Sequence, residues 1–273
     1  MGSLQNKTGR AFEYGIAIAL SKNLLVSIKD NAPLYNARRC FEFCSNREQE
    51  RIVKASNEIT AFLIAHDTRL IKGTCYIFIQ SDQQGEYGDV RDVIIHNIQT
   101  NENIGISAKN RHFAVKHSRL SEQIDFGAKW LGVHCSENYF KTIVPIFRDL
   151  NNKKRKGEQW KNIPNKQQLY YMPVLQAFKQ EMQSLLEKQA NRTFKALMYY
   201  LLGKYDYYKI IKENGSVSII SFNMNGTLKW GNRVPLPTRI IEVAHKPDSE
   251  TTLFLPLIMV GKSHSVSIML LQW

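Results

Sequence analysis

The sequence predicts an α/β fold that ends in a β-rich part, and three observations lead to this prediction. A periodic, helix-like stretch near the N-terminus precedes three strand-like runs between residues 74 and 109. A long amphipathic stretch over residues 174–202 predicts one helix or a pair of helices, closed by Gly203 as a C-cap. After Gly215 the pattern changes to short runs rich in β-branched residues, which favour strands.

The N-terminal helix is predicted from the alanine-rich run GIAIALSKN, with Thr8 as its N-cap. Glu13 falls in an early turn, where the helix dipole favours an acid whatever its other role. Residues 35–71 then predict one or two more helices. Their mixed charge is more typical of a solvated face than of a binding face.

Three strand-like runs follow, at residues 74–80, 93–95 and 104–109. Turn-forming residues 100–103 separate the second run from the third. Because strand side chains alternate between faces, Ser107 and Lys109 share one face. A hairpin that folds near residues 99–100 places Asp92 opposite them. We therefore expect a carboxylate and an ammonium group together at one end of a sheet.

Such a pair suits the hydrolysis of a phosphodiester. A carboxylate at a strand end can hold a divalent metal ion, which polarises the phosphate and lowers the pKa of a bound water. A nearby lysine can orient that water or offset the charge that builds up in the transition state. The spacing alone leaves open the alternative of an exposed hairpin with an ordinary surface ion pair.

The C-terminal half predicts helices and then short strands. Recurring apolar and aromatic residues over 122–150 predict a core helix, and the lysine-rich run 151–157 predicts a loop. Segment 204–209 sets tyrosines beside lysines, which suits either stacking on bases or packing between parts of the fold. Further strands are predicted at 216–223, 227–230 and 239–243, with a hairpin turn at Asn225-Gly226.

The charge of the chain indicates a polyanionic partner. Lys and Arg outnumber Asp and Glu by 37 to 24, which gives a formal net charge of +13. Contacts from such residues to phosphates supply most non-specific affinity for nucleic acids. A basic surface without any nucleic-acid function is the alternative.

The cysteines and the apolar content suggest an intracellular globular protein. Cys40 and Cys44 have helical spacing but no second close pair follows, so we expect free thiols in a reducing compartment and no zinc site. The N-terminus lacks the apolar core of a signal peptide, and no apolar run is long enough to span a bilayer. We therefore expect a soluble, cytoplasmic protein without a membrane partner.

Two stretches resemble a known family of nucleases. GDVRDVII followed by GISAK resembles the metal-binding hairpin of the PD-(D/E)xK nucleases. The longer string GISAKNRHFAVKHSRLS, with IDFGAKWLG after it, resembles the type II restriction endonucleases of the HaeIII family, which cut GGCC. The resemblance covers about residues 9–250. It implies a restriction-endonuclease-like core, in which helices flank a mixed sheet, with a β-rich C-terminal part for recognition.

The resemblance also implies the residues of the active site. Asp92 is the expected principal ligand of magnesium, with Asp89 and Glu13 as candidate partners, and Lys109 is the water-orienting or charge-offsetting base. Ser107 departs from the signature, which has Asp or Glu at that position, so one metal ligand is missing. Glu13 is the best replacement, because the GRAFEY stretch resembles the family's N-terminal helix, whose glutamate lies beside the active site.

Basic and polar residues near the hairpin and in later loops are the expected DNA contacts. They are Asn110, Arg111, His112, Lys116, His117, Ser118, Arg119, Lys153, Lys154, Arg155, Arg233 and Arg239. His112 and His117 are also compatible with a nucleophile-activating pair. No serine or cysteine elbow accompanies them, however.

The resemblance implies a metal-dependent deoxyribonuclease of a restriction–modification system that cuts double-stranded DNA. A DNA methyltransferase encoded nearby is the implied functional partner, and the oligomeric state is open. We expect residues 1–150 to form the catalytic core. Residues 151–273 form a helical segment and a β-rich recognition part packed with it. The alternatives are an inactive DNA-binding protein derived from such a nuclease, and a non-specific repair or RNA nuclease.

The C-terminal segment differs from the ending expected of the family. LIMVGKSHSVSIMLLQW lacks clean strand alternation. Back-translation in the neighbouring frame gives a string that resembles the family ending, DNGW followed by FRIHNAS. We therefore hypothesise a frameshift near residues 252–257, which replaces the last strands from about residue 253 and truncates the protein.

Overall fold

The computed structural model describes residues 4–110, 120–188, 190–233, 244–245, 252–259 and 262–269. The chain divides into two compact units. Unit 1 comprises Met1–Phe113 and Gly203–Pro235, and unit 2 comprises Ala114–Leu202 and Leu236–Trp273. These boundaries differ from the expected division at residue 150, because two strands from beyond residue 203 join the sheet of unit 1. The assignment of DNA recognition to residues 151–273 stays a prediction.

Unit 1 is built on a mixed sheet of six strands in the order β1-β2-β3-β4-β5-β6. The strands are β1 (Ser27–Ile28), β2 (Cys75–Ile79), β3 (Val93–Asn97), β4 (Asn103–Asn110), β5 (Tyr207–Lys212) and β6 (Val217–Phe222). The β1–β2 and β4–β5 pairs are parallel and the other neighbouring pairs are antiparallel. The mixed sheet confirms the predicted fold class.

Three helices belong to unit 1: α1 (Leu4–Leu24), α2 (Ala32–Glu42) and α3 (Asn46–His66). Short 3₁₀ turns follow at η1 (Thr68–Leu70) and η2 (Asp82–Tyr87). The side chain of Asn31 caps α2 and that of Ser45 caps α3, so the predicted stretch 35–71 holds two helices. The prediction that Thr8 is the N-cap of the first helix was wrong, because α1 begins four residues earlier and contains Thr8.

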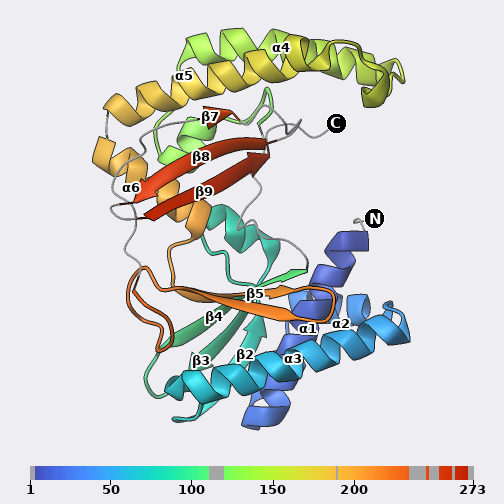
Figure 1. Cartoon of the computed structure of the whole chain (residues 1–273), viewed down its shortest axis with the longest axis vertical. Helices are drawn as coiled ribbons and strands as arrows, with labels where there is room; N and C mark the ends of the chain where they lie inside the picture. The colour runs from blue at the N-terminus through green and yellow to red at the C-terminus, as the bar shows by residue number, and fades with distance from the viewer. Residues whose placement is uncertain are drawn as a thin grey trace. The chain divides into compact units, whose positions relative to one another are not determined.

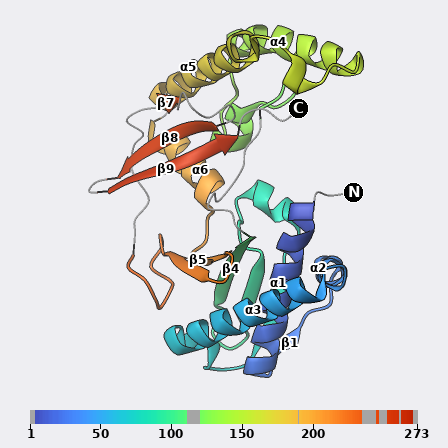
Figure 2. The same ribbon diagram turned by 45° about the vertical axis from the view of Figure 1, so that its right-hand side comes forward.

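Helices α1 and α3 lie against one face of the sheet (Figures 1 and 2). The core between them consists of buried apolar side chains, among them Phe12, Ile16, Ile59, Leu63, Ile77, Ile95 and Ile106. Burial of this area is the main stabilising term of the unit. It also fixes α1, and therefore Glu13, against the sheet.

The β3–β4 hairpin has the predicted arrangement. Its antiparallel register runs from Val93 opposite Ile106 to His96 opposite Asn103. Asp92 precedes β3, and its backbone N–H donates to the Ile106 carbonyl at 2.7 Å. The register therefore brings Asp92 to the end of the sheet where the residues after Ile106 lie.

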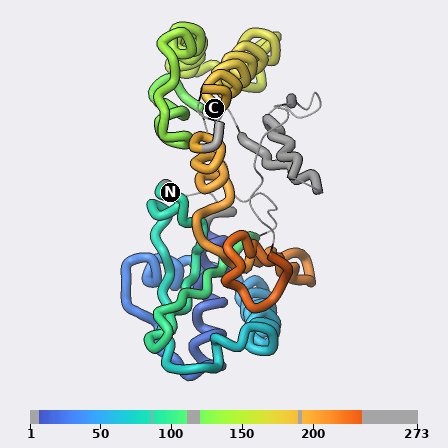
Figure 3. Tube along the Cα trace, turned by 90° about the vertical axis from the view of Figure 1, so that its left-hand side faces the viewer, coloured from blue at the N-terminus to red at the C-terminus, as the bar shows by residue number. Residues whose placement is uncertain are grey.

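Unit 2 contains α4 (Glu137–Arg155), α5 (Met172–Lys188) and α6 (Ala190–Leu202), with short helical turns η3 (Gly127–Leu131), η4 (Trp160–Asn162) and η5 (Gln167–Tyr171). Helices α4 and α5 lie side by side (Figures 1 and 3). Their core includes Phe126, Trp130 and Phe178. The pair α5 and α6 confirms the predicted helices over 174–202.

Two predictions in this part were wrong. The predicted core helix 122–150 is divided into η3 and α4. The predicted lysine-rich loop belongs to α4 as far as Arg155. Basic residues occupy the last turn of this helix, where the dipole favours positive charge, and a loop is therefore not required to expose them.

The predicted strand over 227–230 was also wrong, because polar side chains hold this segment in bends. The Asp206 carboxylate accepts from the Thr227 N–H at 2.8 Å, and the Asn223 side chain accepts from the Leu228 N–H at 3.0 Å. These bonds take the donors that a strand ladder would need. The predicted strand 239–243 lies outside the described residues.

A separate three-stranded antiparallel sheet is formed by β7 (Ala244–His245), β8 (Thr252–Met259) and β9 (Lys262–Met269). Strands β8 and β9 thus form in the segment whose sequence lacks clean strand alternation. The frameshift itself stays a prediction. None of the described helices has the length and apolar character needed to cross a membrane.

Candidate active site

Asp92 lies at the end of the β3–β4 hairpin, with its carboxylate held in one orientation. Oδ2 accepts hydrogen bonds from the Ala108 N–H at 2.8 Å, the Lys109 ammonium at 3.1 Å and the Ser107 hydroxyl at 3.3 Å. The three described donors that bond this carboxylate all reach Oδ2, which leaves Oδ1 for another partner. Both charged side chains are accessible, at 20% exposed for Asp92 and 23% for Lys109.

Glu13 comes to the same place from α1 and is only 6% exposed. The Arg10 guanidinium donates to its Oε2 at 2.6 Å and also pairs with Asp82. Burial raises the pKa of Glu13 to about 8, and repulsion from the Asp92 carboxylate adds to the rise. The two acids are therefore close enough to repel each other, and a shared cation would relieve that repulsion.

These residues fit a magnesium ion. Among the described residues no group of three or more His, Cys, Asp or Glu side chains could hold a metal. Magnesium does not require such a group, since it keeps several waters and is often bound by one or two carboxylates and substrate phosphates. Asp92 and Glu13 supply two carboxylates, each with one oxygen engaged by a described donor.

Asp89, the third expected metal ligand, has a different partner. Its two carboxylate oxygens accept from Nε and Nη2 of Arg91 at 2.8 and 2.7 Å. Arg91 in turn lies over the ring of Tyr205 at 4.0 Å and crosses Gly105, where a Cβ would meet Arg91 Cδ at 2.0 Å. A bidentate ion pair of this kind orients Arg91, so we leave Asp89 out of the proposed metal site.

Ser107 is fully buried next to Asp92, as expected of the position where the nuclease signature has an acid. Sequence reasoning did not find three other residues near the site. Arg10 holds Glu13, and Tyr207 and Lys209 lie on β5 beside β4. The available signal was the aromatic and β-branched run at 207–211, which predicts a strand.

The expected DNA contacts are distributed over both units. Asn110 ends β4 and its amide donates to the Thr8 hydroxyl at 2.9 Å. Lys153, Lys154 and Arg155 lie in the last turn of α4, and Arg233 is exposed in unit 1. The remaining expected contacts, Arg111, His112, Lys116, His117, Ser118, Arg119 and Arg239, lie outside the described residues. All of these DNA contacts stay predictions.

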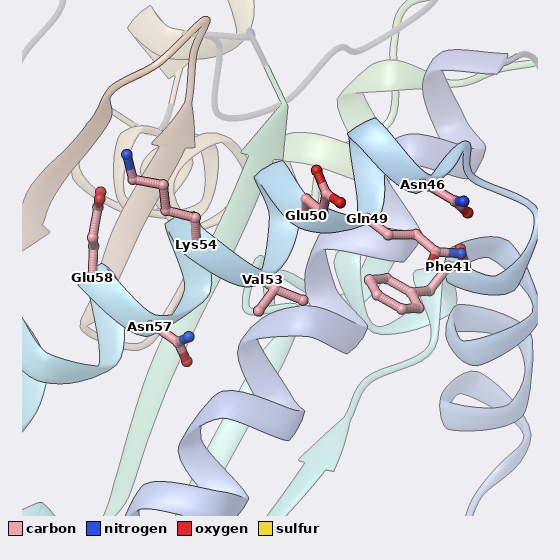
Figure 4. Close-up of a pocket in the computed structure, with 8 residues that line it drawn as sticks. All are labelled: Phe41, Asn46, Gln49, Glu50, Val53, Lys54, Asn57 and Glu58. Carbon is pink, nitrogen blue, oxygen red and sulfur yellow. The ribbon is translucent and has the colours of Figure 1, made fainter.

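A hollow on α2 and α3 is separate from this group (Figure 4). It is lined by Phe41, Asn46, Gln49, Glu50, Val53, Lys54, Asn57 and Glu58. Two acids and one lysine on its wall do not suit a polyanion. The group around Asp92 and Lys109 therefore stays the candidate for the chemistry.

The sheet is mixed, its central hairpin ends in an Asp–Lys pair, and a packed helix supplies a buried glutamate. This arrangement is compatible with the site expected of a nuclease of the PD-(D/E)xK type. Comparison with known proteins specifies this class further. The model of the HaeIII restriction endonuclease family matches residues 9–269. The chain therefore belongs to the HaeIII restriction endonuclease family, and its class of activity is that of a type II restriction endonuclease.

A curated relative agrees with this assignment. The type II restriction enzyme HaeIII of Haemophilus aegyptius is 36% identical over 278 residues, which cover 94% of this chain and 86% of the relative. No solved structure matches. The match to the family extends through β9, and thus includes most of the C-terminal segment discussed above.

Proposed function

We propose that this chain cuts double-stranded DNA at GGCC with magnesium as its metal. Two observations support the proposal. The first is membership of the HaeIII family over nearly the whole chain. The second, which carries the chemistry, is the Asp92 carboxylate bonded to the Lys109 ammonium at 3.1 Å at the end of the sheet.

Asp92 and Glu13 are the residues that hold the metal in this proposal. When bound, magnesium polarises the phosphate and lowers the pKa of a bound water. Ser107 cannot replace the missing carboxylate, since a hydroxyl carries no charge. It keeps Asp92 oriented instead, through the hydrogen bond at 3.3 Å.

Lys109 orients the attacking water and offsets charge on the phosphate. The water oxygen forms a bond to phosphorus, the bond from phosphorus to the leaving oxygen breaks, and the leaving oxygen takes a proton. One water is consumed, and the products are a phosphate monoester and a hydroxyl group. Ala108 contributes through its backbone N–H, which keeps the Asp92 carboxylate fixed while charge shifts.

The partners follow from this activity. The substrate is double-stranded DNA, to which a net charge of +13 contributes long-range attraction. A DNA methyltransferase encoded nearby would protect the host's own sites, and both enzymes would act in the cytoplasm. The dependence of DNA affinity on salt concentration measures how many phosphates the protein contacts.

The Lys109→Ala variant tests the proposal, because Lys109 acts mainly on the transition state. We expect cleavage to be lost while DNA binding, measured by fluorescence anisotropy without magnesium, remains close to that of the wild type. Lys72→Ala, an exposed lysine near the opposite end of β2, is the matched control and should cleave normally. Cleavage by Lys109→Ala at nearly the wild-type rate would remove Lys109 from the active site.

A further inference from the structure

Another hollow lies in unit 2, along the C-terminal half of α4. Its wall is formed by Glu122, Gln123, Val144, Arg148, Asn151, Asn152 and Arg155. Two arginines thus accompany a single acid, whereas the hollow on α2 and α3 has two acids and one lysine. The hollow on α4 therefore carries the positive charge that a polyanion requires.

The polar wall of this hollow belongs to one face of α4. We name as the polar stripe the four exposed residues Arg148, Asn151, Asn152 and Arg155. Residues three, four and seven positions apart emerge on one side of a helix. Ile143, Phe147 and Leu150 are buried and hold the other side of α4 in the core of unit 2. The core therefore fixes the direction in which the polar stripe faces.

The guanidinium groups of Arg148 and Arg155 are not neutralised by any residue that the structure describes. Two acids that are near them in sequence are engaged elsewhere. Asp149 accepts from the Tyr170 hydroxyl at 2.5 Å, and Glu158 pairs with another lysine at 3.8 Å. Both arginine side chains are exposed, so their charges are available to a ligand.

Glu122 supplies an acceptor to the same hollow. It is half-buried, and the amide of Asn151 donates to its Oε1 at 3.0 Å. Over the described part of the chain no other group donates to this carboxylate, so Oε2 stays open. An acid is unfavourable in a surface that only contacts phosphates, because it repels them. A free carboxylate oxygen suits an amino group instead.

Arginine and glutamate together match the edges of G·C base pairs. In the major groove guanine presents two acceptors, N7 and O6, and cytosine presents a donor, its N4 amino group. Arginine bonds guanine in a bidentate way, and glutamate accepts from cytosine. The amides of the hollow can bond phosphates as well as bases, so the choice of base depends on Arg148, Arg155 and Glu122.

The length of the polar stripe agrees with a short recognition site. Arg155 follows Arg148 by seven positions, which corresponds to about 10 Å along a helix. Successive nucleotides of one strand are about 3.4 Å apart along the axis of DNA, so this length covers about three steps, the extent of four base pairs. The major groove is about 12 Å wide and admits an α-helix.

We propose that α4 reads the recognition site in the major groove of DNA, with Arg148 and Arg155 donating to guanine and Glu122 accepting from cytosine. This inference rests on the proposed function, from which the GGCC site is taken. Arg155 was already among the expected DNA contacts, whereas Arg148 and Glu122 were not.

The first test uses the wild-type protein and altered DNA. Duplexes with one GGCC site receive a single 7-deazaguanine in place of guanine, which removes the N7 acceptor and retains base pairing. Binding is measured by fluorescence anisotropy without magnesium, so that the DNA stays intact. We expect at least one replacement within the site to weaken binding by about 10-fold or more. Replacements outside the site should have no effect.

Two variants then identify which arginine contacts which guanine. Arg148→Ala and Arg155→Ala should each bind the unmodified site about 10- to 100-fold less tightly. Each should also lose its response to 7-deazaguanine at the position that the missing arginine contacts, because the two changes remove the same hydrogen bond. Both side chains are exposed, so the variants should fold normally.

Glu122→Ala gives a result whose sign separates base reading from phosphate contact. If Glu122 accepts from cytosine, its removal should weaken binding to GGCC by about 10-fold. Binding to DNA without the site should stay the same or become tighter, since a negative charge has been removed. A surface that contacts only phosphates would bind both DNAs more tightly.

Arg192→Ala is the matched control. Arg192 is an exposed arginine of α6, also in unit 2, and lies outside the hollow. Its substitution removes the same charge as Arg148→Ala does. It should change binding to DNA with and without GGCC by the same small factor and leave the response to 7-deazaguanine as in the wild type.

Uniform effects would overturn the inference. If Arg148→Ala and Arg155→Ala weakened binding to all DNA by one factor, with a shallower dependence on salt, α4 would contact phosphates only. Tighter binding of GGCC by Glu122→Ala, or no response of the wild type to 7-deazaguanine anywhere in the site, would also refute base reading by α4. The proposed function fails on a different result, namely magnesium-dependent cleavage that survives in Asp92→Asn.

Discussion

The groups around Asp67 and around Asp92 both lie in unit 1, and they differ in how fully their charged and polar atoms are bonded. Asp67 is fully buried and accepts from Nε and Nη2 of Arg69 at 2.8 and 2.5 Å and from the Tyr208 hydroxyl at 2.8 Å. Its partners lower the pKa of Asp67 although burial acts against them. At the active site, by contrast, burial and the Asp92 carboxylate raise the pKa of Glu13.

The contrast extends to two neighbouring residues of one strand. Tyr208 points into the core and bonds Asp67, whereas Tyr207 points to the active-site face and has no hydrogen-bond partner among the described residues. A closed network contributes to stability and leaves nothing for a ligand to bind. Acids that repel each other and an unsatisfied hydroxyl are features of a functional site. The presence or absence of hydrogen-bond partners for buried polar groups thus distinguishes the Asp67 group from the Asp92 group more clearly than the degree of burial does.

The largest expected effects come from removing one charge in each group. Asp92→Asn should reduce cleavage by about 1000-fold or more, since the residue acts on metal and phosphate, with little change in the free energy of unfolding. Asp67→Asn should lower that free energy by about 3–5 kcal/mol, because it leaves the buried Arg69 without its anion. Its cleavage rate per folded molecule should stay near that of the wild type.

Cleavage assays and urea denaturation on the same preparations check both halves of this prediction. A loss of stability in Asp92→Asn together with a loss of activity in Asp67→Asn would contradict the assignment of a functional role to Asp92 and a stabilising role to Asp67.

A smaller effect is expected from Glu13→Gln. Loss of one of two metal-binding carboxylates should raise the magnesium concentration for half-maximal cleavage by about 10-fold or more. Glu42→Gln, at an exposed acid on α2, is the control and should leave the titration unchanged. If Glu13 served only the helix dipole, its substitution would change stability by a few tenths of a kcal/mol and leave the magnesium requirement where it was.

The two tyrosines allow a finer comparison. Tyr208→Phe should lower the free energy of unfolding by about 1–2 kcal/mol, because it deprives the buried Asp67 of a hydrogen bond. Tyr207→Phe removes a hydroxyl that has no described partner, so stability should stay the same or rise slightly. Urea denaturation without metal measures both. Equal losses in the two variants would mean that the Tyr207 hydroxyl is bonded in solution.

The smallest expected effect is a difference in pH dependence. The pKa of Glu13 rises from 4.5 to about 8 on folding, so the metal-free folded state binds more protons in that interval and stability should fall as pH rises through it. The pKa of Asp67 is lowered, so its contribution is present above the ordinary pKa and is lost as pH falls through the folded value.

Denaturation midpoints measured in a metal chelator across this interval should therefore decline with pH in the wild type and decline less in Glu13→Gln. Parallel profiles for the two proteins would show that Glu13 titrates normally in the folded state.

The hairpin was predictable from the sequence because its contacts are local. Alternation and a turn placed Asp92 opposite Ser107 and Lys109, and the register agrees. Glu13 came from the resemblance to a family, since its approach to the hairpin depends on how α1 packs. Roles of these side chains in catalysis stay predictions.

The position of Lys209 was not predictable in this way. Its place beside Ser107 depends on a parallel pairing of β4 with β5, and residues 114–202 of unit 2 lie between these strands in the chain. Such non-local pairing has no local signal. Asp89 stays a candidate from the sequence, and its ion pair with Arg91 could not be read from the spacing that suggested it.

The central claim is that Asp92 and Lys109 form the centre of a site-specific, metal-dependent nuclease. Mapping the ends of fragments cut from a DNA of known sequence, with and without magnesium, tests it most directly. The claim predicts cleavage only with magnesium, ends that share GGCC, and intact DNA with either Asp92→Asn or Lys109→Ala. Fragments that form without a divalent metal, or ends that share no sequence, would contradict it.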